Sequence, residues 1–163
     1  MNSIDYECFS FYPIDRLLLD DTLKMAATRC KDLKSVKIET RGERLTNIPC
    51  TEGLLSLLEV QGRNLTSIKI FANFKKWGID DNFCKNLAKY AINLKKLDLC
   101  TCRYVTNEGV KFICGQKLVT GCLKLEYIDL TFTDVTLQGK LICEQHLPCL
   151  KVLKVEAKTR YEL

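Results

Sequence analysis

The chain has 163 residues, of which 47% are hydrophobic and 28% are charged, so it can bury enough apolar surface to fold as one compact domain or one short repeat array. Its 25 basic and 20 acidic residues leave a net charge of +5, and most basic residues lie within a few positions of an acidic one. Because phosphate recognition needs a cluster of one sign, nucleic-acid binding is not expected.

The first residues of the chain and the length of its apolar runs bear on where in the cell the protein is expected. Residues 1–10 contain Asp5 and Glu7 and lack the basic and then apolar pattern of a secretory signal. The longest apolar runs fall far below the roughly 20 residues of a bilayer-spanning helix. We therefore expect no membrane partner and a cytoplasmic or nuclear location, where the 10 cysteines behave as small buried hydrophobes rather than as a disulfide framework.

The predicted elements repeat along the chain. Residues 1–22 are expected to form an N-terminal segment or cap, and residues 23–163 a repeat domain. The strand pattern L-x-x-[apolar]-x-[apolar] occurs five times, starting at Leu33, Leu65, Leu94, Leu125 and Leu150. These leucines are separated by 32, 29, 31 and 25 residues. A period of this size is typical of stacked structural units.

Segments with helical spacing of apolar residues lie between the strand patterns. They cover about residues 23–30, 54–58, 83–91, 110–114 and 137–142. Residues suited to capping a helix start precede them: Asp20 or Asp21, Thr51, Asp80 or Asp81, Thr106 or Asn107, and Asp134 or Thr136. Because one strand and helix cannot bury their apolar face alone, the units should stack into an α/β solenoid of about five units with a parallel sheet on its concave face.

One unit carries a specific motif. Residues 94–110 read Leu94-Lys-Lys-Leu97-Asp-Leu99-Cys-Thr-Cys102-Arg-Tyr-Val-Thr-Asn-Glu-Gly109-Val. This stretch resembles the cysteine-containing leucine-rich repeat of F-box proteins and of related ribonuclease-inhibitor-like proteins, L-x-x-L-x-L-x-x-C-x-x-[IV]-T-[DN]-x-G-[LV]. The next unit keeps most of this pattern, with Thr133 near the place of the cysteine. The resemblance is motif-specific from about residue 91 to 139 and architectural from about 20 to 156.

The resemblance implies a non-enzymatic protein–protein interaction module, in particular the substrate-recognition repeats of an F-box type (SCF) ubiquitin ligase. An F-box binds a Skp-type adaptor and needs about 40 or more residues ahead of the repeats, whereas 32 precede Leu33. The adaptor is therefore expected only if an F-box lies outside this chain. The alternative is a stand-alone leucine-rich-repeat scaffold or assembly factor with no role in ubiquitin ligation.

Strand residues that alternate with the apolar ones should face away from the core and bind a protein or peptide. The middle column of these residues is Lys37, Lys69, Asp98, Asp129 and Lys154. The column before it is Ser35, Ser67, Lys96, Tyr127 and Val152, and the column after it is Glu39, Phe71, Cys100, Thr131 and Glu156. We expect the two central carboxylates to contact a charged partner and the aromatic rings to be its anchors. The alternative is that these positions are polar only for solubility.

Three further expectations concern the same surface. The segment 71–78 is the densest aromatic and basic cluster, and Trp77 in it is a candidate contact or else a cover for the end of the core. Lys96 and Tyr127 complete the candidate partner-binding set. Replacing both Asp98 and Asp129 with lysine is expected to abolish binding while leaving thermal stability nearly unchanged.

The sequence offers few candidate catalytic residues or metal ligands. Zinc sites are typically built from two close ligand pairs, and Cys100 with Cys102 is one pair. The single histidine, His146, ends the last predicted helix, and the adjacent Asp80 and Asp81 are interpreted as helix caps rather than as an acid and a base. We expect no enzymatic activity, no cofactor and no metal, and we interpret the cysteines at 30, 84, 114, 122 and 143 as packing residues.

Overall fold

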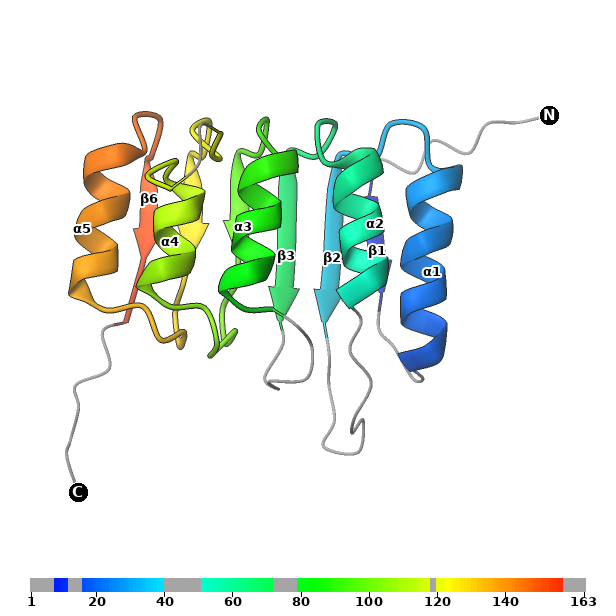
Figure 1. The fold of residues 1–163 in the computed structure, drawn as a ribbon, viewed down its shortest axis with the longest axis horizontal. Coiled ribbons are helices and arrows are strands. Elements are labelled where there is room, and N and C mark those ends of the chain that lie inside the picture. The colour runs from blue at the N-terminus through cyan, green and yellow to red at the C-terminus, as the bar shows by residue number, and fades with distance from the viewer. Residues whose placement is uncertain (1–7, 12–15, 40–50, 72–78, 118–119, 157–163) are drawn as a thin grey trace, which may run out of the picture.

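The computed structural model describes residues 8–11, 16–39, 51–71, 79–117 and 120–156 (Figure 1). In this part of the chain strands and helices alternate. Their bounds are β1 Cys8–Phe11, α1 Arg16–Arg29, β2 Ser35–Glu39, α2 Thr51–Gln61, β3 Ser67–Phe71, α3 Asp81–Tyr90, β4 Lys96–Asp98, α4 Asn107–Ile113, β5 Tyr127–Asp129, α5 Leu137–His146 and β6 Val152–Lys154. The predicted α/β class and the alternation of strand and helix are confirmed.

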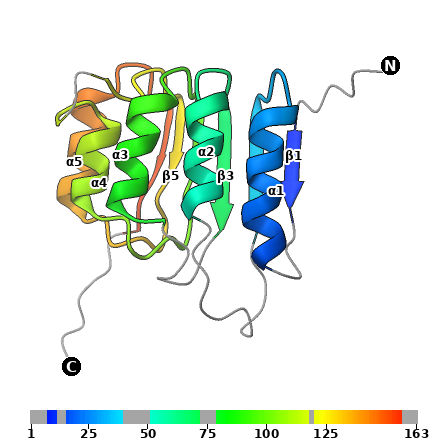
Figure 2. The same cartoon turned by 45° about the vertical axis from the view of Figure 1, so that its right-hand side comes forward.

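The strands form one parallel sheet in chain order, β1-β2-β3-β4-β5-β6. Figure 1 shows the five helices side by side in front of this sheet, and the turned view in Figure 2 keeps helices and strands in two separate layers. The described helices therefore cover one face of the sheet and leave the other face without a helical layer. None of them combines the length and apolar character needed to cross a bilayer.

The core lies between the two layers and consists of the ladder that the sequence pattern predicts. The first leucine of each of the first four predicted strand patterns is fully buried, at Leu33, Leu65, Leu94 and Leu125. In each of these four patterns the two apolar positions after the first leucine are buried as well, for example Leu97 and Leu99 after Leu94. Helix residues close the core from the other side: Leu23, Leu57, Leu58, Leu87, Val110, Ile113 and Cys143. Burial of this area is the main stabilising contribution of the fold.

The N-terminal end differs from the expectation for residues 1–22. A sixth strand, β1, pairs with β2 in parallel, with Phe9 opposite Val36 and Phe11 opposite Ile38. Helix α1 begins at Arg16, so the predicted boundary at residue 22 falls inside it and the predicted cap at Asp20 or Asp21 is wrong. Strand β1 and helix α1 thus form one more unit of the same sheet and helix layer.

Asp20 instead binds the start of the next helix, and this contact recurs along the helix layer. The Asp20 Oδ1 atom accepts a hydrogen bond from the Gly53 N–H group of α2 at 2.6 Å. Asp81 at the start of α3 accepts from the Thr106 N–H group at 2.8 Å and from the Gly109 N–H group of α4 at 3.0 Å. Asn107 of α4 accepts from the Thr136 N–H group at 3.0 Å. These side chains satisfy backbone donors that a helix start leaves unpaired.

Glycine leaves room for the acceptor side chains at two of these helix starts. A Cβ atom on Gly109 would lie 2.5 Å from Asp81 Oδ1, and one on Gly139 would lie 2.4 Å from Asn107 Oδ1. Both distances are shorter than any allowed contact. The glycine of the T-[DN]-x-G motif therefore permits the close approach of one helix start to the next.

Two of the predicted helix caps are confirmed within single helices. Asp80 caps α3 by accepting from the Phe83 N–H group at 3.0 Å. Thr106 caps α4 by accepting from the Glu108 N–H group at 3.1 Å. Thr136 occupies the capping position of α5 but makes no such bond there, and its hydroxyl accepts instead from the Asn107 side chain at 2.8 Å.

Leu97 provides a test of the buried ladder. Leu97→Ala should lower the free energy of unfolding by about 2–5 kcal/mol, because it leaves a cavity in a fully buried position. Urea unfolding followed by circular dichroism measures this loss. The matched control is Leu141→Ala on α5, where the leucine is 53% exposed and the same change should cost less than about 0.5 kcal/mol. Equal losses in the two variants would contradict the burial pattern.

Asp81 provides a test of the contacts between helix starts. Asp81→Ala removes the acceptor of the Thr106 and Gly109 N–H groups and of the Thr106 hydroxyl, and should lower the free energy of unfolding by about 2 kcal/mol. The control is Asp21→Ala, an exposed aspartate on α1, for which we expect a change within about 0.5 kcal/mol. A change in Asp81→Ala no larger than in the control would show that these bonds do not hold the helices together.

Candidate interaction surface

The sheet face that no described helix covers is called the open face here. Val36, Ile68, Leu97 and Ile128 point into the core from β2, β3, β4 and β5. Because side chains alternate along a strand, the residues directly before and after each of them lie on the open face. Its described members are Ser35, Lys37, Ser67, Lys69, Phe71, Lys96, Asp98, Tyr127, Asp129, Val152 and Lys154, followed just beyond the strand ends by Cys100, Thr131 and Glu156.

The strand register brings the predicted columns together. Lys37, Lys69, Asp98, Asp129 and Lys154 are direct neighbours from β2 to β6. Ser35, Ser67, Lys96, Tyr127 and Val152 form the adjacent column in the same way. In the third column Phe71 pairs with Glu39, whereas the later members lie beyond the ends of their strands. The predicted alignment of the charged column is confirmed.

The two central carboxylates each pair with a lysine of the strand on their outer side. Lys69 Nζ lies 3.0 Å from Asp98 Oδ2, and Lys154 Nζ lies 3.6 Å from Asp129 Oδ2. The side chains of Asp98 and Asp129 are only 16% and 11% exposed, whereas those of their lysine partners are 46% and 55% exposed. The carboxylates therefore lie low against the sheet, and the ammonium groups reach further into solvent.

Asp98 and Asp129 also hold the turns in which the chain leaves the sheet. Asp98 Oδ1 accepts from the Cys100 N–H group at 3.1 Å, and Asp129 Oδ1 accepts from the Thr131 N–H group at 3.0 Å. These bonds argue against the expectation that both aspartates could become lysine with little loss of stability. Replacing both aspartates with lysine removes these turn hydrogen bonds. It also places the new lysines beside Lys69 and Lys154, so attraction between opposite charges becomes repulsion between like charges.

Asp129 is the more buried of the pair and remains ionised. Burial raises the pKa of Asp129, but hydrogen bonds from Thr131 and Tyr127 and the charge of Lys154 outweigh it, so the pKa lies below its ordinary value. The Tyr127 hydroxyl donates to Asp129 Oδ2 at 3.1 Å. The Lys154 ammonium group lies 5.4 Å from the centre of the Tyr127 ring. Tyr127, Asp129 and Lys154 therefore form one connected cluster on β5 and β6.

The remaining predicted contacts lie on the same surface or outside the described residues. Phe71 is half-buried at the end of β3, and Lys96 is exposed on β4. Lys37 is half-buried on β2. Trp77 lies outside the described residues.

The described cysteines from Cys30 to Cys149 are free thiols, and most of them lie in the core. Cys84, Cys114, Cys122 and Cys143 are buried, and the Cys122 thiol donates to the Leu87 carbonyl oxygen at 3.8 Å. Burial raises the pKa of Cys122 to about 12. These four positions are packing residues, as predicted, and Cys30 is partly buried against the same core. Burial keeps the Cys122 thiol protonated at neutral pH.

Cys100 and Cys102 point to opposite sides. Cys102 is buried, with its thiol donating to the Ile70 carbonyl oxygen at 3.5 Å, whereas Cys100 lies on the open face. Burial and the charges of Asp129 and Asp98 raise the pKa of Cys100. Among the described residues no group of three or more His, Cys, Asp or Glu side chains is arranged to hold a metal ion.

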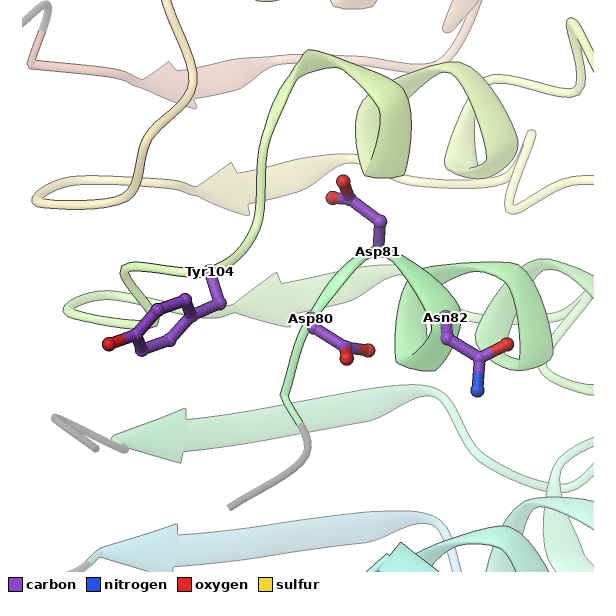
Figure 3. A pocket seen from close by; sticks show the side chains of 4 residues that line it. All are labelled: Asp80, Asp81, Asn82 and Tyr104. Atoms are coloured by element: carbon purple, nitrogen blue, oxygen red, sulfur yellow. The ribbon is translucent and has the colours of Figure 1, made fainter. Parts of the chain in front are cut away.

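A shallow hollow of about 310 Å³ lies beside the start of α3, lined by Asp80, Asp81, Asn82 and Tyr104. Figure 3 shows Asp81 directed toward α4, away from Asp80 and Asn82. Both carboxylates accept hydrogen bonds from helix starts, Asp80 from α3 and Asp81 from α4. Two acids that diverge and cap helices do not face a common substrate, so the hollow offers no acid–base pair.

Strand β1 adds an edge strand to the sheet that the leucine pattern does not predict. In the register, Cys8 is the neighbour of Ser35, and Ser10 is the neighbour of Lys37. The alternation of Phe9 and Phe11 with smaller residues is the signal that could have indicated this strand.

Comparison with known proteins gives no family for the chain. The sequence matches no protein-family model, and no curated protein is similar to it.

Asp129→Asn tests the role of the buried carboxylate through its dependence on pH. The pKa of Asp129 is lowered in the folded chain, so its ionised form stabilises the fold above the unfolded pKa of about 4, and this contribution disappears as the pH falls through the folded value. We expect Asp129→Asn to be less stable than the wild type by about 1 kcal/mol at pH 7, with the difference shrinking below about pH 4.

Urea unfolding of both proteins at pH 7, 5, 4 and 3 measures this difference. The matched control is Asp32→Asn, which changes an exposed aspartate between α1 and β2. A difference for Asp129→Asn that stays constant across this range would show that the ionised carboxylate does not stabilise the fold.

Proposed function

We propose that the chain is a short leucine-rich-repeat solenoid that acts as a non-enzymatic protein-interaction module. The observation that carries the proposal is the open face, on which two columns of side chains from five parallel strands lie in register. A solenoid of strand and helix units presents such a surface as one continuous binding face, because helices are wider than strands and stacking curves the sheet inward. The motif of residues 94–110, with Cys102 buried and Gly109 against Asp81, supports this architecture.

The edge of the open face provides a second argument. Phe132 lies in the turn after β5 with a φ angle of 59° and is 53% exposed. A left-handed backbone is costly for a bulky residue and suits glycine. An exposed aromatic ring kept at such a position is typical of a contact surface.

The two exposed leucines of α5 offer a weaker surface. Leu137 and Leu141 are 62% and 53% exposed on α5. Lys140 and Glu144, an ion pair at 3.8 Å, alternate with them on the same helix. The resulting patch is small and interrupted by charge, so we favour the open face over the helical layer as the binding surface.

By resemblance, the role that we propose is substrate recognition for an F-box type (SCF) ubiquitin ligase, with the open face holding the substrate and a Skp-type adaptor bound elsewhere. The alternative is a stand-alone leucine-rich-repeat scaffold or assembly factor. It uses the same surface without an adaptor or a cullin. A cytoplasmic or nuclear location suits both roles.

Affinity capture from the cells of origin, with the full-length gene product and two bulky variants, tests the proposal. Ser67→Trp places a large ring in the middle of the open face, and Gln138→Trp places the same ring on the exposed side of α5. We expect a Skp-type adaptor and a cullin to be identified with all three proteins, and the substrate partner to be lost with Ser67→Trp alone. Thermal unfolding confirms that both variants are folded.

Two outcomes would change the conclusion. Capture of a partner without adaptor or cullin would favour the scaffold alternative. A partner kept by Ser67→Trp and lost by Gln138→Trp would move the binding surface to the helical layer.

A further inference from the structure

On the open face the negative charges lie close to the sheet and the positive charges lie further out in solvent. Asp98 and Asp129 are 16% and 11% exposed and accept backbone hydrogen bonds, so their negative charge lies at the level of the strands. The ammonium groups of Lys69 and Lys154 lie above them on side chains that are 46% and 55% exposed. A molecule that approaches this face meets positive charge first.

Two other features make the surface more basic and give it an anchor. Lys96 is exposed in the neighbouring column, beside the half-buried Tyr127. Lys154 lies against the Tyr127 ring, which keeps its ammonium group above β5. Among the described residues of the open face, Glu156 is the exposed acidic side chain, and it lies at the far edge after β6.

We propose that the partner of the open face is an acidic polypeptide segment, an inference that rests on the interaction role proposed above. Its carboxylates bind Lys69, Lys96 and Lys154, and an apolar side chain packs on Tyr127. An ammonium group has three N–H donors, so a lysine that contacts an aspartate of the sheet can also bind a carboxylate of a partner.

The spacing of the lysines fits an extended peptide. Lys69 on β3 and Lys154 on β6 are separated by three strand intervals, about 14 Å at the usual strand spacing. Four residues of extended chain span about 13 Å. A segment that crosses the strands with acidic residues four positions apart therefore places one carboxylate at each lysine.

A peptide fits this surface better than a nucleic acid. A phosphate backbone carries charge continuously, and between the two lysines it would cross the Asp98 and Asp129 carboxylates. A peptide places neutral or apolar residues there and carboxylates only at the ends.

The experiment measures binding of a defined probe to the full chain. Three fluorescein-labelled twelve-residue peptides share one sequence of alanine and serine with a central leucine, and they carry glutamate, glutamine or lysine at every fourth position. Fluorescence anisotropy at low salt should show binding of the glutamate peptide, at least about tenfold tighter than binding of the other two, and weakening as salt is added.

Two lysine variants locate the site. Lys96→Glu should weaken binding of the glutamate peptide by about three- to tenfold, whereas Lys85→Glu on α3, an exposed lysine of the helical layer with the same change in net charge, should leave it within about twofold. Lys69→Gln combined with Lys154→Gln should weaken it as well without placing a new carboxylate beside the aspartates.

Each other outcome overturns a different statement. Equal binding of all three peptides, with backbone chemical shifts changing on β3 to β6, would keep the open face as the binding surface and overturn its preference for acid. Shift changes confined to the helices, or no binding by any peptide, would overturn the acidic partner, and the former would also contradict the proposed interaction surface. Tighter binding of a twelve-nucleotide single-stranded DNA than of the glutamate peptide would overturn the choice of a polypeptide.

Discussion

The close contact between successive helix starts is the constraint on which the rest of the structure depends. Each unit buries its apolar strand residues against its own helix and its neighbours, so the helices must follow one another at a regular step along the array. Asp81 fixes that step by accepting two N–H groups of the next helix start, and Gly109 allows it because no Cβ atom intervenes. Asn107 makes the same contact with Thr136, and Asp20, the fifth residue of α1, makes a related one with Gly53 of α2.

The surface chemistry of the open face follows from that step. Once the strands lie in parallel register, residues from units about 30 positions apart in the chain become direct neighbours, so a sequence with separated lysines and aspartates gives the order Lys69, Asp98, Asp129, Lys154 across the sheet. Two adjacent carboxylates would repel each other in isolation. Here each has a lysine on its outer side and a backbone N–H group at its own turn, and these contacts offset the repulsion between the two carboxylates.

The sequence was sufficient to predict the ladder and the columns, because both depend only on periodicity. The two-residue alternation in β2 to β5 places Leu97 in the core and Asp98 on the opposite face, and the leucine spacing aligns the units. It was not sufficient for β1, whose Phe9 and Phe11 lack the leading leucine of the other strands. Nor could alternation predict that Asp129 is nearly buried, because its burial comes from Tyr127, Lys154 and the turn at Thr131, all contacts that require three-dimensional coordinates.

The turns after β4 and β5 show that the edge of the open face is built to one plan with different side chains. Asp98 and Asp129 open the two turns, Thr101 and Phe132 occupy the left-handed position at φ angles of 72° and 59°, and the buried Cys102 and Thr133 return the chain to the core. Glycine at the left-handed position would relieve about 1 kcal/mol or more of backbone strain in each turn. Neither turn has it. Phe132 places its ring in solvent just beyond the end of β5, one of the strands that carry the charged column. Backbone strain kept beside a surface of aligned charges supports the proposal that a partner would bind the open face rather than the helical layer.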